Sequence, residues 1–141
     1  MVPHHRLTRR AAVLPVASAA AAMLPVRRVR AQQLARPVAH PTPRPGITGA
    51  KVLTAAQMTR SSDLVELFDG IREIPHIADG IGCHCRCAEF GGHRSLLTCY
   101  EGDAMALSCP ICQGEGRVAV RLTKAGKSLD EIRAAIDAQF G

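Results

Sequence analysis

The sequence has few aromatic residues: no Trp, one Tyr and three Phe among 141 residues. Aromatic side chains bury much apolar area per residue, so their scarcity limits the hydrophobic core. Small chains with little core are commonly stabilised by cross-links or by a bound metal ion. The composition therefore predicts a small core with a further source of stability.

The sequence also lacks an apolar run long enough to span a bilayer. Its uncharged run Ala11–Leu24 has fourteen residues, whereas a membrane helix needs about twenty. Basic residues precede this run and Val29-Arg30-Ala31 follows it, so we interpret residues 1–31 as a cleaved export signal. Thr8-Arg9-Arg10 resembles the twin-arginine signal. We expect a periplasmic or secreted protein that keeps no stable membrane span after cleavage.

An excess of positive charge is absent from the chain that remains. The full sequence has eighteen Lys and Arg against twelve Asp and Glu, but six of the basic residues lie at or before Arg30. None of the acidic residues do, so residues 32–141 have a net charge of zero. A surface that binds phosphates needs an excess of Lys and Arg. We therefore expect no nucleic-acid partner, and the sequence indicates no particular protein partner.

The rest of the chain divides into a linker and one domain. Residues 32–51 are rich in proline and predict an extended tether. Residues 52–141 predict a small, mainly α-helical domain. Apolar residues at steps of three and four favour helices over 54–74, 109–125 and 128–140, the last with a Ser128–Glu131 capping box. An irregular loop with many cysteines separates the first two helices.

All six cysteines lie within thirty residues, as a C-x-C-x-C run, a single cysteine and a C-x-x-C pair. Alternate residues of an extended strand point to one side, so the C-x-C-x-C run can direct its sulfurs to one ion. The C-x-x-C pair is expected at a helix N-terminus, which favours thiolates. Thiolates are soft ligands that select copper(I) and zinc, and imidazole binds both metals. The spacing predicts a copper or zinc site. Its candidate ligands are Cys83, Cys85, Cys87, Cys99, Cys109, Cys112, His84 and His93.

Two alternatives follow from the same cysteines. An exported chain meets oxidising conditions, so three disulfides holding a structural module are the first alternative. The second is a thiol–disulfide oxidoreductase or thiol carrier, with Cys109 as the attacking sulfur and Cys112 as the resolving one. The sequence does not decide whether the protein is an enzyme, because no pair of catalytic carboxylates, phosphate-binding loop or Ser–His pair stands out.

The segment Ile81-Gly82-Cys83-His84-Cys85-Arg86-Cys87 resembles the signature of exported bacterial proteins named for a Pro-Cys-Tyr-Cys-Gly-Cys motif. The similarity continues through Cys99-Tyr100, Cys109–Cys112 and the helix after Gly126. The resemblance implies a lipoprotein or secreted protein in which a metal-binding role is suspected. Gly82, His84 and Arg86 replace the proline, tyrosine and glycine of the motif. A likeness limited to Cys109-Pro-Ile-Cys112-Gln113 and the C-terminal helix links the chain to the helical thiol proteins of cytochrome c maturation.

Overall fold

The computed structural model describes residues 37–141, which belong to one unit. The predicted export signal, residues 1–31, lies outside the described residues, as does the start of the predicted linker. The described part is α-helical and 3₁₀-helical, and its β-pairing is confined to the isolated bridge between Val52 and Glu101. The mainly α fold expected from the sequence is therefore confirmed.

Two of the three expected helices are confirmed. Helix α5 runs over Pro110–Lys124 and has its proline in the first turn, where the missing N–H costs no hydrogen bond. Helix α6 runs over Leu129–Phe140 and begins with the predicted capping box, in which Ser128 and Glu131 satisfy each other's backbone amides. Gly126, at a φ of 74°, turns the chain between them.

The expected helix over 54–74 is broken into shorter pieces. A 3₁₀ turn spans Ala55–Gln57, another spans Ser62–Leu64, and helix α2 covers Val65–Glu73. Thr, Ser and Asp residues, which have low helix propensity, are concentrated from Thr59 to Asp63, where the helix is interrupted. Pro75 ends α2, as expected, but its fixed φ also suits a first helical position. A further helix, α3, therefore runs over Pro75–Asp79.

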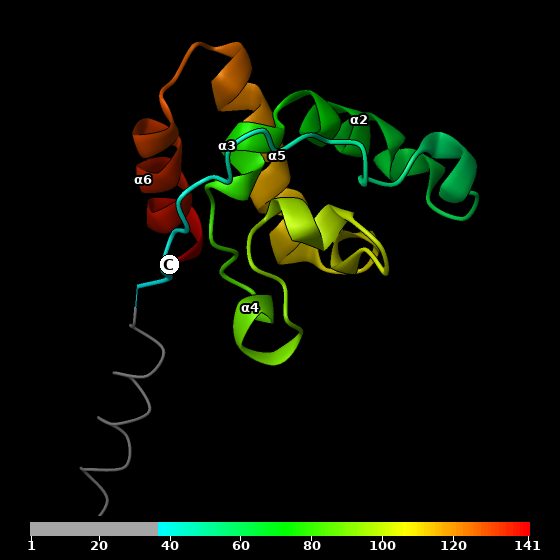
Figure 1. The fold of residues 1–141 in the computed structure, drawn as a ribbon, viewed down its shortest axis with the longest axis horizontal. Coiled ribbons are helices and arrows are strands. Elements are labelled where there is room, and N and C mark those ends of the chain that lie inside the picture. Colours follow the sequence, from blue (N-terminus) through cyan, green and yellow to red (C-terminus); the bar gives the residue numbers. More distant parts are fainter. Residues whose placement is uncertain (1–36) are drawn as a thin grey trace, which may run out of the picture. The chain divides into compact units, whose positions relative to one another are not determined.

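The loop after α3 contains short helical pieces. They are α4, over Cys87–Phe90, and 3₁₀ turns over Leu97–Tyr100 and Met105–Leu107. Helix α5 contacts α2, α3, α6 and the Met105–Leu107 turn, so it lies at the centre of the packing (Figure 1). In the described residues no helix combines the length and the apolar character needed to cross a bilayer.

The core is built around the few aromatic rings available. Tyr100 and Phe68 are fully buried and pack edge to face, with ring centroids 4.7 Å apart. Small residues let α5 approach them closely: an added Cβ at Gly116 would lie 2.0 Å from the Tyr100 hydroxyl. The single tyrosine of the sequence therefore joins α2 to the first turns of α5.

The described part of the proline-rich segment contains no helix or strand and is held against the helices. Arg133 of α6 donates to the Pro41 carbonyl, and the Arg94 side chain donates to that of Thr42. Arg44 donates through its backbone and side chain to the buried carboxylate of Asp79. This segment crosses from α6 past α3 towards α2 (Figure 1). The unit that contains the cysteines thus includes residues 37–51, which we had expected to form a tether.

Candidate metal centre

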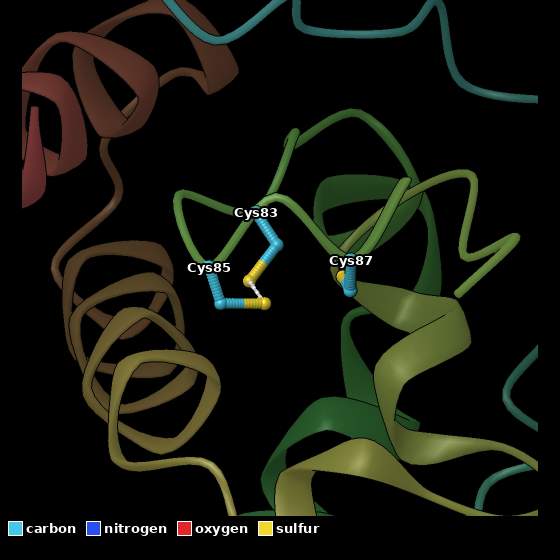
Figure 2. Close-up of side chains that lie close together, drawn as sticks. All are labelled: Cys83, Cys85 and Cys87. Atoms are coloured by element: carbon cyan, nitrogen blue, oxygen red, sulfur yellow. Dashed lines mark hydrogen bonds between the residues drawn. The ribbon is translucent and has the colours of Figure 1, made fainter. Parts of the chain in front are cut away.

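A tight turn carries the first three cysteines. The Arg86 amide donates to the Cys83 carbonyl over 3.1 Å, which closes a turn with His84 and Cys85 at its centre. Arg86 then adopts the left-handed conformation, at a φ of 59°, and Cys87 begins α4. Cys83 and Cys85 point their sulfurs towards each other (Figure 2). A turn rather than an extended strand therefore brings these thiols together.

The C-x-x-C pair lies at the start of α5. Cys109 is the extended N-cap residue and Cys112 is in the first turn. The Tyr100 hydroxyl donates to the Cys112 carbonyl over 2.7 Å, and the Gln113 side chain donates to the Ala106 carbonyl over 2.9 Å. These two bonds tie the first turn of α5 to the loop that holds Cys99.

The two cysteine segments meet. The Cys83 and Cys112 sulfurs lie 3.5 Å apart, and those of Cys85 and Cys112 lie 3.6 Å apart. The Cys83–Cys85 and Cys87–Cys99 sulfur separations are both 3.2 Å. A disulfide bond is about 2.05 Å long, whereas sulfurs bound to one ion at about 2.3 Å stand about 3.8 to 4.0 Å apart. The observed separations of 3.2–3.6 Å are thus far longer than a disulfide bond and about 0.2–0.8 Å shorter than those of sulfurs bound to one ion.

All six cysteines of the sequence are in the described part, and all six are free. Their sulfurs, here called the sulfur cluster, form three groups of three in which the sulfurs lie within 4.8 Å of one another. The groups are Cys83, Cys85 and Cys87; Cys83, Cys99 and Cys112; and Cys85, Cys109 and Cys112. The structure thus brings together all six cysteines that the sequence predicted as ligands.

No family model, curated protein or solved structure matches this chain. The resemblance to the proteins of the Pro-Cys-Tyr-Cys-Gly-Cys motif therefore stays an expectation drawn from the residues.

Three thiols of the cluster, those of Cys83, Cys99 and Cys112, have raised pKa values when no metal is bound. The pKa of Cys83 is raised above its usual range, chiefly by the hydrogen bond with Cys112 and also by burial and the Glu115 carboxylate. For Cys99 and Cys112, one hydrogen bond within the cluster lowers the pKa. A second hydrogen bond within the cluster and burial of the thiol both raise the pKa. These two effects together exceed the lowering, so the pKa values of Cys99 and Cys112 are above the usual range. A metal ion that binds here must displace these protons, and a buried, protonated thiol is a poor nucleophile.

The two candidate histidines are in none of the three sulfur groups. The Nδ1 atom of His84 lies 2.7 Å from Glu115 Oε1, and its Nε2 atom lies 3.2 Å from Asp137 Oδ1. Both ring nitrogens therefore face carboxylates. His93 donates from Nδ1 to the Thr98 carbonyl over 3.1 Å.

Glu115 is a site residue that the sequence analysis missed. It is fully buried, and its Oε1 accepts from both the His84 amide, over 2.8 Å, and the His84 ring. Its other oxygen, Oε2, has no hydrogen-bond partner among the described residues. The available signal was helical spacing: Glu115 follows Cys112 by three residues and precedes Ala119 by four, so it lies on the buried face of α5.

Proposed function

We propose that this protein binds a soft metal ion through its cysteines, copper first and zinc second, and handles that metal outside the cytoplasm. The observation that supports this most is the 3.5 Å separation between Cys83 and Cys112, which are 29 residues apart in the chain. Six free thiols in one cluster, four of them buried and two half-buried, are a donor set suited to soft ions.

The size of the sulfur groups favours copper over zinc. Each group offers three sulfurs, and copper(I) is satisfied by three thiolates or fewer. Zinc in structural sites is almost always bound by four ligands. His84 lies between Cys83 and Cys85 in the sequence and could supply a nitrogen ligand. Its ring nitrogens, however, lie against the carboxylates of Glu115 and Asp137. A set of three sulfurs is therefore complete for copper(I), whereas zinc would need a fourth ligand.

The conformation of Arg86 supports the proposed relationship to the Pro-Cys-Tyr-Cys-Gly-Cys proteins. That motif has glycine at this position, and here the residue has a φ of 59°, a conformation that glycine adopts at no steric cost. A turn of the same kind in those proteins would arrange the thiols in the same way.

Export would separate the site from the reducing cytoplasm. A twin-arginine signal would let the domain fold and load its metal before export, which would protect the thiols from pairing. Replacing Arg9 and Arg10 with Lys tests this part of the proposal. Normal export of that variant would contradict the twin-arginine route without affecting metal binding.

Elemental analysis and thiol counting on anaerobically purified protein test the metal-binding proposal. We expect bound copper, and thiols that react with a chromogenic reagent only after a copper(I) chelator is added. A variant with exposed His76 changed to Ala is the matched control and should bind the same amount. Six oxidised cysteines without metal would instead support the disulfide-held module, and two reactive thiols with four oxidised would support the oxidoreductase.

A further inference from the structure

The three sulfur groups overlap in a regular way. Each pair of groups shares one sulfur: Cys83, Cys85 or Cys112. Each group also has one sulfur of its own, from Cys87, Cys99 or Cys109. Three metal positions in these groups would therefore use every cysteine, three as bridges and three as terminal ligands.

The three shared sulfurs form a nearly regular triangle. Its edges are 3.2 Å for Cys83–Cys85, 3.5 Å for Cys83–Cys112 and 3.6 Å for Cys85–Cys112. Each edge belongs to one group, and the terminal sulfur of that group lies within 4.8 Å of both its ends. An ion on each edge would have two bridging sulfurs and one terminal sulfur, which is three-coordinate geometry.

We infer that the protein binds three copper(I) ions in a ring of alternating copper and sulfur. Cys83, Cys85 and Cys112 bridge neighbouring ions, and Cys87, Cys99 and Cys109 complete their coordination. This inference rests on the proposed function and specifies its stoichiometry. A single ion between Cys83, Cys85 and Cys112 would use only three of the six thiols and leave Cys87, Cys99 and Cys109 without a metal ion.

The balance of the loading step is simple. Six thiols release six protons and three copper(I) ions bind, with no change in oxidation state, so the ring has three negative charges. The N-terminus of α5, a helix of fifteen residues, places partial positive charge beside Cys109 and Cys112. That charge offsets part of the negative charge of the ring.

The two half-buried cysteines form a matched pair for testing the ring. Cys85 is a bridging ligand and Cys109 a terminal one, and both belong to the same group. Loss of a terminal sulfur weakens one copper position, whereas loss of a bridging sulfur weakens two. We therefore expect Cys109→Ser to bind two copper ions and Cys85→Ser to bind at most one.

Anaerobic titration with copper(I), followed by native mass spectrometry, measures these numbers directly. The wild-type protein should saturate at three copper ions. X-ray absorption should show a copper–copper distance that is typical of two ions bridged by one sulfur. Circular dichroism of both variants checks that they fold. Saturation of the wild type at one ion, or equal losses in two folded variants, would overturn the ring but leave metal binding in place. No copper binding by the reduced wild type would overturn both proposals.

Discussion

The Glu115 carboxylate holds His84 by two hydrogen bonds through one oxygen atom. Oε1 lies 2.8 Å from the His84 amide nitrogen and 2.7 Å from the ring Nδ1. Because His84 is at the centre of the turn between Cys83 and Arg86, this contact fixes the turn against α5. Glu115 is thus a positioning residue, which acts on the sulfur cluster through the loop.

Glu115→Ala should therefore destabilise the metal-free protein. The buried amide and ring of His84 would lose their acceptor, which costs about 2–3 kcal/mol. Glu115→Gln keeps an acceptor oxygen and should cost about half as much. Urea unfolding of the reduced protein, followed by circular dichroism, measures both losses. If the two variants lost the same stability, the hydrogen bonds to His84 would not be the reason.

Arg86→Gly should stabilise the protein. A residue with a Cβ atom in the left-handed region costs about 1–2 kcal/mol, and glycine removes this cost. Glycine also makes the unfolded chain more flexible, which lowers the free energy of unfolding by about 0.5–1 kcal/mol. The expected net gain is about 0–1.5 kcal/mol. Arg86→Ala is the control, because it removes the ion pair with Glu89 but keeps the Cβ atom. A thermal unfolding midpoint that rises in Arg86→Ala as well would contradict this explanation.

Gly116→Ala should disturb the start of α5. The new Cβ would lie 2.0 Å from the Tyr100 hydroxyl, which is fully buried and donates to the Cys112 carbonyl. Overpacking of this kind costs about 1–3 kcal/mol. Displacement of Tyr100 should also lower the number of copper ions bound.

Gly114→Ala provides the comparison for that variant. Its Cβ would meet the Phe140 ring at 2.9 Å, but this ring lies in the last turn of α6, is partly buried and can move aside. We expect full copper binding and a smaller loss of stability. Equal losses of copper in both variants would show that the Tyr100 contact does not position Cys112.

Asp79→Asn should destabilise the protein at neutral pH. Burial alone would raise the pKa of Asp79, but hydrogen bonds from Arg44 and Ser95 hold it at about 2, against an ordinary value of 3.8. This difference corresponds to about 2 kcal/mol. Because the folded pKa is lower than the unfolded one, the stabilisation is complete above pH 3.8 and is lost as the pH falls to about 2.

Urea unfolding at several pH values tests this assignment. The stability difference between wild type and Asp79→Asn should be largest at neutral pH and should shrink below pH 3.8. A difference that stayed constant down to the lowest pH would show that the charge of Asp79 is not its source. Changing exposed Asp103 to Asn should have little effect at any pH.

Local sequence patterns predicted much of the helical structure. Helix α6 was predicted from its capping box and apolar spacing, and α5 from Pro110 after Cys109, because these features act within one or two turns of the chain. The same local reasoning failed over 54–74. There, residues of low helix propensity interrupt the apolar pattern, and Pro75 both ends one helix and begins another.

The sequence by itself determined which donor groups this protein offers, because six thiols lie within thirty residues of the chain. Only the tertiary structure decided which sulfurs lie together, that Glu115 engages His84, and that residues 37–51 pack against the helices. These features join residues far apart in the chain: 29 residues separate Cys83 from Cys112, and 97 separate His40 from Asp137. Such contacts depend on how the helices pack, and neither spacing nor composition specifies that packing.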